Sequence, residues 1–394
     1  MTRIAILGAG PIGLEAALAA AQRGNEYTVY EAADTVGGHV RAWGHVRTFT
    51  PWSMNVSPRM RAALPGTPGG DALPSGTQLA DELLEPIAAL PELAGRIRLG
   101  TRVLQVGREG LLKHEAIGDP RRAKRPFRLL VAMPDGSQEI DHADVVIDAT
   151  GTYGNPNRLG DGGIDAVNER AFDDRIERYL PAIESQPERW AGQTILLTGS
   201  GHSAQTAVRQ LAAFARDAPG TRVVWAVRKP EPDWGAVDSD PLPERASLNA
   251  AAAELAGGAS DAVALRPGCV TEALHGRGER IVVTLRNGEP DEIEVDRILA
   301  LNGGVGDHAL YRQLQVHECY ATSGPMNLAA TLLGEAGGDC LAIGSPGPET
   351  LRNPEPGFFI LGAKSYGRNS QFLLQVGWRQ VDDVFESLIE QGAR

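Results

Sequence analysis

The stretch "RIAILGAGPIGLEAALAAAQRG" (residues 3–24) decides the fold. Its apolar start predicts a short buried strand, and glycines interrupt the chain at 8–13. The Ala/Leu-rich run that follows predicts a helix ending at Gly24. A second strand, "YTVYE" at 27–31, comes next. Strand, helix and strand in this order form a βαβ unit, which predicts an α/β fold with a parallel sheet.

The glycine turn has the spacing of a dinucleotide-binding site, with Gly8, Gly10 and Gly13 in sequence. The first glycine permits a tight turn, the second lets the backbone approach a pyrophosphate, and the third lets the helix pack closely. The helix N-terminus then directs its amides at the phosphates. Glu31 ends the second strand, where a carboxylate can accept hydrogen bonds from a ribose hydroxyl and repel a 2′-phosphate.

A glycine pair, Gly37 and Gly38, follows this acid in "EAADTVGGH" (31–39). An acid, a short spacer and two glycines are typical of sites where a longer cofactor continues past the ribose. The pair therefore favours FAD over NAD at the first site, with an ordinary turn as the alternative.

A second unit of the same kind begins at "QTILLTGSGHSAQTAVRQLAAFA" (193–215). It again predicts strand, glycine turn and helix, with Gly199 and Gly201 in the turn. Ala204 replaces the third glycine by the smallest side chain that has a Cβ. The sequence therefore predicts two nucleotide sites in one chain.

The residues after the next strand, "TRVVWAVRKP" (221–230), predict which nucleotide the second site takes. No acid directly follows this strand; Arg228 and Lys229 stand where a 2′-phosphate would lie, which favours NADPH over NADH. Plain surface charge is the alternative for this pair. In the loop, Ser203 is a candidate phosphate donor. His202 is a candidate contact to the nucleotide, or simply a histidine at a helix start.

Composition limits the partners and the compartment. The chain has 394 residues and a net charge of −12, which argues against nucleic acid or an anionic membrane as partner. No apolar run approaches the roughly 18 residues of a membrane span. We expect the one basic cluster, "PRRAKRPF" (120–127), to be a solvated hairpin rim. The only cysteines, Cys269, Cys319 and Cys340, are widely spaced, which fits a cytoplasmic protein without a disulfide framework or an adjacent dithiol, and no metal site is expected.

These motifs resemble the flavoproteins with two dinucleotide-binding domains, which include thioredoxin-reductase-like enzymes and class B flavin monooxygenases. The resemblance covers most of the chain: "GAGPIGLEAAL", "YEAADTVGG", "ATGTYGNPN", "GSGHSA" and "FFILGAKSYGRNSQFLLQVG". It implies a Rossmann-like FAD-binding domain built from residues 1–157 and 301–394. A Rossmann-like NADP-binding domain, residues 158–300, would be inserted between them.

The resemblance also implies two further segments around the FAD. One is the turn that closes on the cofactor, and the other is a C-terminal segment near the flavin ring at the start of the last helix. The corresponding residues here are Ala149, Thr150 and Gly151, and Gly362, Ala363, Lys364 and Ser365.

A finer match is "MNVSPRM" (54–60), which is similar to the N-x-P-[KR]-x-M neighbourhood of flavin monooxygenases with one residue inserted. There the asparagine lies beside the reactive carbon of the flavin and stabilises its hydroperoxide. By that resemblance Asn55 is the candidate catalytic residue, and an Asn that caps a turn is the alternative. The F-x-G-x-x-x-H-x-x-x-[WY] fingerprint is missing from 171–193, which argues against a Baeyer–Villiger monooxygenase.

Taken together, the sequence predicts an NADPH-dependent FAD oxidoreductase, with a monooxygenase of small molecules as the leading hypothesis. One alternative is a reductase or dehydrogenase that passes electrons to a quinone, a thiol or a partner protein. Another is a flavin-binding redox sensor without turnover. The substrate and the oligomeric state stay open, a homodimer being one option.

Overall fold

The computed structural model describes residues 2–237, 239–334 and 347–392. Cys340 lies outside them. Within these ranges no helix is both long enough and apolar enough to cross a membrane.

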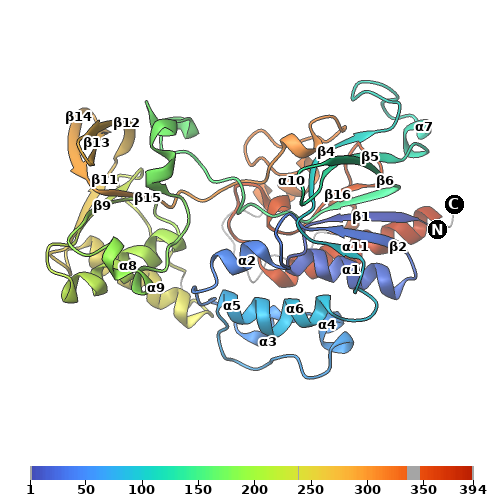
Figure 1. The fold of residues 1–394 in the computed structure, drawn as a ribbon, viewed down its shortest axis with the longest axis horizontal. Helices are drawn as coiled ribbons and strands as arrows, with labels where there is room; N and C mark the ends of the chain where they lie inside the picture. The colour runs from blue at the N-terminus through green and yellow to red at the C-terminus, as the bar shows by residue number, and fades with distance from the viewer. Residues whose placement is uncertain (1, 238, 335–346, 393–394) are drawn as a thin grey trace. The chain divides into compact units, whose positions relative to one another are not determined.

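The chain forms two compact units (Figure 1). Unit 1 contains residues 1–155 and 305–394, and unit 2 contains residues 156–304. Unit 2 is thus an insertion in unit 1, and the chain enters and leaves it close to the domain boundaries predicted at 157/158 and 300/301.

A parallel sheet forms the centre of unit 1. Its order is β16 (Phe358–Ile360), β7 (Val145–Asp148), β1 (Arg3–Leu7), β2 (Glu26–Tyr30) and β3 (Ile97–Arg98). The apolar residues of β1 are buried on both faces, as expected for a parallel strand that is covered on both sides. β16, from the far end of the chain, pairs with β7 and completes the sheet.

Different layers cover the two faces of this sheet (Figure 1). Helices α1 (Pro11–Gln22) and α11 (Leu374–Gly392) pack on one face, and an antiparallel sheet packs on the other. That sheet contains β4 (Arg102–Arg108), β5 (Phe127–Ala132) and β6 (Gln138–Ala143). β6 could not be predicted from the sequence, because its residues are mostly polar and lack an apolar alternation.

The remaining helices of unit 1 are short. They are α2 (Gly38–Ala42), α3 (Trp52–Asn55), α4 (Pro58–Ala63), α5 (Gly76–Leu79), α6 (Glu85–Ala88), α7 (Pro120–Ala123) and α10 (Met326–Gly334). A π-helical turn at Ala80–Leu84 joins α5 to α6. After β16 a 3₁₀ turn covers Gly362–Tyr366, so the predicted cofactor segment precedes the last helix, which begins only at Leu374.

Among the cations of the basic cluster at 120–127, one differs from the prediction. Arg122 is buried, and its guanidinium donates to both carboxylate oxygens of Glu355. Arg108 donates to the same carboxylate from β4. A solvated rim is therefore wrong for Arg122, because a buried carboxylate is stable only with ionic partners.

Unit 2 repeats the design of unit 1. Its parallel sheet has the order β11 (Val263–Pro267), β10 (Arg222–Val227), β9 (Thr194–Thr198), β15 (Arg297–Ala300) and β8 (Ile176–Glu177). Its helices are α8 (His202–Asp217) and α9 (Pro243–Ala256). An antiparallel sheet of β12 (Val270–Arg277), β13 (Arg280–Asn287) and β14 (Glu289–Val295) completes the unit.

Candidate functional site

The first glycine turn joins β1 to α1 at the carboxyl edge of the unit 1 sheet. Gly8 has a φ of +99°, and a Cβ there would lie 2.9 Å from the carbonyl oxygen of Ala149. A Cβ on Gly13 would lie 1.9 Å from the carbonyl oxygen of Gly8. These two glycines are thus required by the fold itself.

Gly10 is different, because the fold does not require it. Its φ of −81° and ψ of −173° are open to any residue, and a Cβ there would meet nothing within 4 Å. Gly10 lies at the N-cap of α1, and as a glycine it has no side chain that could cap the helix. A bare backbone beside the free amides of a long helix fits an approaching phosphate.

Glu31 lies against this turn. Its carboxylate accepts hydrogen bonds from the backbone N–H of Ala9 (2.7 Å) and of Ala33 (2.9 Å). The N–H of Gly37 donates to the carbonyl of Ala9 (3.0 Å), and a Cβ on Gly38 would lie 2.4 Å from that of Ala33. The structure therefore brings the predicted acid and glycine pair together with the first glycine turn.

The 149–151 turn also reaches this edge of the sheet. Ala149 contacts Gly8, and the hydroxyl of Thr150 donates to Asp148 (2.7 Å). Gly151 has a φ of +71°. The turn is thus fixed by the last residue of β7.

Lys364 reaches the same turn from the C-terminal segment. Its ammonium donates to the buried carboxylate of Asp148 (2.6 Å), to the carbonyl of Asp307 (2.7 Å) and to the hydroxyl of Thr150 (3.2 Å). Both charged side chains of the ion pair are almost fully buried, at 1% and 0% exposure. The side chain of Lys364 is therefore already bound within the protein.

The neighbours of Lys364 link the C-terminal segment to α1 and α11. Gly362 packs against Ile12 in the first turn of α1, and its N–H donates to the side chain of Gln380 in α11 (2.9 Å). The amide of Gln380 in turn donates to the hydroxyl of Ser365 (3.0 Å). Ala363 lies between these two bonded residues of the segment.

The second glycine turn joins β9 to α8 in unit 2. Gly199 has a φ of +108°, and a Cβ there would lie 2.3 Å from the carbonyl oxygen of Leu301. Gly201, at the N-cap of α8, has a φ of −75° and open space around its Cβ position. The two turns are therefore built alike: one glycine is needed for the turn, and another leaves room beside a helix N-terminus.

Cations follow β10 in unit 2, as predicted. Arg228 and Lys229 are both exposed, and Lys229 forms an ion pair with Asp233 (2.9 Å). Ser203, the second residue of α8, is exposed, and His202 is half-buried. Burial, reinforced by the nearby charge of Arg245, lowers the pKa of His202.

Comparison with known proteins identifies this architecture. A family model described as an NAD(P)-binding Rossmann-like domain matches residues 6–61. A segment of 38 residues is 50% identical to N,N-dimethylglycine/sarcosine dehydrogenase from Chromohalobacter salexigens, covering 10% of this chain and 6% of that protein.

Solved structures are similar over the whole chain. Bacillithiol disulfide reductase from Bacillus cereus has a TM-score of 0.70 at 18% identity, with 99% of both chains covered. The FAD-bound cadaverine monooxygenase from Erwinia amylovora has a TM-score of 0.67 at 13% identity, covering 98% of this chain and 94% of that one. Thioredoxin reductase from T. acidophilum has a TM-score of 0.59 at 15% identity, covering 99% and 100%. This chain has the fold of these solved structures, in which one Rossmann-like α/β unit is inserted into another.

The resemblance predicted from the sequence is confirmed at the level of the fold. At identities this low the flavoprotein fold does not bring an activity with it, since one fold supports many reactions. The activity has to be argued from the residues at the two glycine turns.

Asn55, the predicted catalytic residue, is buried in α3. Its amide nitrogen donates to the carbonyls of Thr50 (2.8 Å) and Pro51 (2.9 Å), and its oxygen accepts from the hydroxyl of Thr50 (3.0 Å). Both amide protons are therefore used to hold the turn that precedes α3. A role at a flavin stays a prediction.

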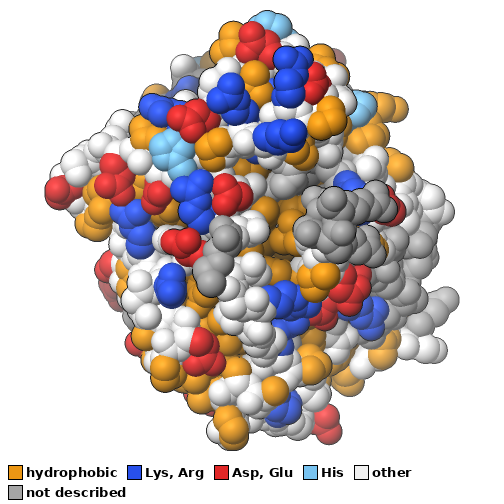
Figure 2. Space-filling model, turned by 90° about the vertical axis from the view of Figure 1, so that its right-hand side faces the viewer, with side chains coloured by type: hydrophobic (Ala, Val, Ile, Leu, Met, Phe, Trp, Pro, Cys, Tyr) orange, Lys and Arg blue, Asp and Glu red, His pale blue; other side chains and the backbone are white. Residues whose placement is uncertain are grey.

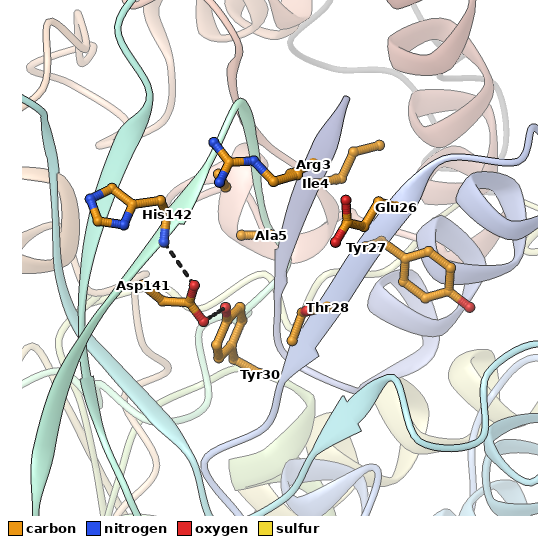
Figure 3. A pocket seen from close by; sticks show the side chains of 10 residues that line it. Arg3, Ile4, Ala5, Glu26, Tyr27, Thr28, Tyr30, Asp141 and His142 are labelled. Carbon is orange, nitrogen blue, oxygen red and sulfur yellow. Dashed lines mark hydrogen bonds between the residues drawn. The ribbon is translucent and has the colours of Figure 1, made fainter. Parts of the chain in front are cut away.

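A small cavity of about 200 Å³ lies away from the first glycine turn (Figure 3). Residues of β1, β2 and β6 line it, among them Arg3, Tyr30 and Asp141. Tyr30 donates to Asp141 (2.6 Å), which closes one side. The cavity contains no residue of the glycine turn, and it is small for a dinucleotide.

The face of the molecule in Figure 2 shows basic and acidic side chains interspersed over its described part. This mixed distribution differs from the basic stripe that a nucleic-acid surface requires.

Sequence reasoning misses several residues that support the second turn. Trp225, Gln205 and Trp234 hold the loop after β10 against it, and Asp233 lies in this loop. The sequence contains one signal for this arrangement, because Asp233 stands four residues after Lys229.

Proposed function

We propose that this protein is an NADPH-dependent FAD oxidoreductase. One observation supports this most directly: two similar glycine turns follow the central strands β1 and β9 of two parallel sheets, and the charges beside them have opposite sign. Glu31 contacts the first turn, whereas Arg228 and Lys229 follow β10 of the other unit. An acid suits an unphosphorylated ribose and cations suit a 2′-phosphate.

Unit 1 would hold FAD. The bare backbone at Gly10 and the N-terminus of α1 would bind the pyrophosphate, and Glu31 would accept hydrogen bonds from the adenosine ribose. When bound, FAD supplies the two-electron chemistry by accepting hydride from a nicotinamide. The residues of the chain orient it: the 149–151 turn is fixed by Asp148, and the segment after β16 is fixed by Gln380.

Unit 2 would hold NADPH. Gly201 and the first turn of α8 would bind its pyrophosphate, with Ser203 as a hydroxyl donor. Arg228 would pair with the 2′-phosphate, because a guanidinium can donate two parallel hydrogen bonds to phosphate oxygens.

Two kinds of acceptor for the electrons of the reduced flavin are supported by observations on this chain. Oxygen insertion into a small molecule is supported by the match of "MNVSPRM" around Asn55 to flavin monooxygenases. Reduction of another acceptor is supported by the geometry of Asn55, whose amide protons are both bound to backbone carbonyls. A mechanism that needs a dithiol lacks support among the described residues, where the free cysteines Cys269 and Cys319 lie in different units.

The test starts with the purified full-length protein. We expect it to be yellow, to release FAD on denaturation, and to oxidise NADPH faster than NADH. In air, NADPH consumption that equals peroxide formation, with a quinone raising the rate, would identify a reductase. Incorporation of ¹⁸O from O₂ into an added amine or sulfide would identify a monooxygenase. A colourless protein that does not bind added FAD would refute the proposal.

A further inference from the structure

An acidic side chain lies directly beside the cations that follow β10. The Oδ2 atom of Asp233 accepts a hydrogen bond from the ammonium of Lys229 (2.9 Å), and Oδ1 accepts one from the backbone N–H of Gly235 (3.2 Å). The hydrogen bond from Lys229 lowers the pKa of Asp233, so the carboxylate is charged at neutral pH. Both oxygens of the carboxylate thus have a hydrogen-bond partner.

The turn that carries Asp233 is held against the second glycine turn. The amide of Gln205, which is 1% exposed, donates to the carbonyls of Ser200 and Trp234, each at 2.9 Å. Because both oxygens bind the same nitrogen, they lie less than about 6 Å apart. The residue after Asp233 therefore lies next to the glycine turn.

Two tryptophans strengthen this attachment. The rings of Trp225 and Trp234 have centroids 4.5 Å apart, and the indole N–H of Trp225 donates to the carbonyl of Gly199 (2.9 Å). The side chain of Asn249 in α9 donates to the carbonyl of Gly235 (3.0 Å). Trp234 has a φ of +53°, a conformation that a bulky residue keeps only when its surroundings hold it.

The position of this carboxylate has a consequence for nucleotide choice. A carboxylate near the end of the second strand accepts hydrogen bonds from a ribose 2′-hydroxyl and repels a 2′-phosphate. Asp233 lies in the loop after β10 and not at the end of the strand, and it contacts Lys229 from there. It also binds the ammonium that a phosphate would otherwise engage.

We propose that Asp233 is a specificity-determining residue that favours NADH and opposes the preference for NADPH set by Arg228 and Lys229. The inference rests on the proposed function, because it concerns the nucleotide that unit 2 binds. The protein then accepts both nucleotides with only moderate preference for NADPH.

The experiment measures binding of NADP⁺ and NAD⁺ to the full-length, FAD-loaded protein by isothermal titration calorimetry. The oxidised nucleotides avoid any redox reaction, so the readout is independent of activity. The variants are Asp233→Asn and Lys229→Met. Asp261→Asn is the matched control, because it removes the same charge from an exposed turn. Asp261 precedes β11, at the amino end of the parallel strands, whereas Asp233 follows the carboxyl end of β10.

We expect Asp233→Asn to bind NADP⁺ about threefold more tightly, since one repelling charge is removed at the solvent-exposed surface. It should bind NAD⁺ about threefold more weakly, since a charged acceptor is lost. The ratio of the two dissociation constants then shifts by about tenfold. Lys229→Met should shift the ratio in the opposite direction, and Asp261→Asn should leave it unchanged.

Each other outcome has a definite meaning. If the unaltered protein binds FAD and prefers NADP⁺ but Asp233→Asn keeps the same ratio, the inference is wrong and the proposed function stands. If Asp261→Asn shifts the ratio as much as Asp233→Asn does, the effect is net charge alone and the inference is again wrong. If the unaltered protein binds neither nucleotide, both the proposed function and the inference are overturned.

Discussion

Replacing Gly10 by Ala, and separately Gly201 by Ala, should remove one cofactor each and leave the fold intact. Both glycines lie at helix N-caps with extended backbone angles, φ −81° and −75°, and a Cβ at either would meet nothing within 4 Å. Alanine caps a helix less well than glycine, but it also restricts the unfolded chain more. These two effects are each below about 1 kcal/mol and oppose each other, so we expect stability to change little.

The effect on binding should be much larger. A methyl group at this position occupies the space through which a pyrophosphate approaches the backbone, so at least one charge-assisted hydrogen bond to an amide is lost. Such a bond contributes about 1.5 to 3 kcal/mol. The dissociation constant of the affected cofactor should therefore rise by about tenfold to a hundredfold.

The assay compares the two variants as a crossed pair. FAD content is measured from the absorbance of the purified protein and from titration of the FAD-free form, and NADP⁺ binding is measured by calorimetry. We expect Gly10→Ala to lose FAD and Gly201→Ala to keep FAD but lose NADP⁺. Thermal unfolding of both variants should match that of the unaltered protein.

The crossed design makes a wrong assignment visible. If Gly10→Ala keeps its FAD while Gly201→Ala loses it, the two units have been assigned in the wrong order. If neither variant changes either affinity although both fold, the open space at these glycines does not serve a phosphate.

Three further predictions concern Gly13, Lys364 and His202. Gly13→Ala should abolish folding of unit 1, seen as insoluble or protease-sensitive protein, because its Cβ would lie 1.9 Å from the carbonyl oxygen of Gly8. Lys364→Met should lower the free energy of unfolding by about 3 to 5 kcal/mol in urea titrations, because the buried Asp148 loses its partner; adding Asp148→Asn should recover most of the loss. Burial lowers the pKa of His202, so protonation favours the unfolded chain and stability should fall as the pH drops below about 6.5. The melting temperature of His202→Gln should fall less between pH 7 and pH 5.

The parallel sheets could be predicted because their strands are apolar and adjacent to glycine turns with fixed chemistry. β1 and β9 both follow this pattern, and the structure places each in the middle of its sheet. β6 could not be predicted in the same way. β6 is polar and mostly exposed, and its register is set by pairing with β5, which is a tertiary interaction.

The residues at the first turn could be predicted because their spacing along the chain is set by the geometry of one βαβ unit. In the structure Glu31 and Gly37 both form hydrogen bonds with the backbone of Ala9, the residue after Gly8. The support of the second turn could not be predicted, because it depends on contacts between Gln205 and Trp234, which lie in different elements. No local pattern specifies such a pair.

Lys364 shows most clearly how burial changes the meaning of a residue that a motif selects. Its place in the C-terminal segment suggests a cation that contacts the cofactor. A cation buried to 1% exposure, however, needs a charged partner within the protein, and Asp148 supplies it at 2.6 Å. The same ammonium donates to Asp307 and Thr150, on the two stretches of chain that lead to and from unit 2. The side chain of Lys364 is therefore used to fix the 149–151 turn, and a direct contact of this residue to a cofactor stays a prediction.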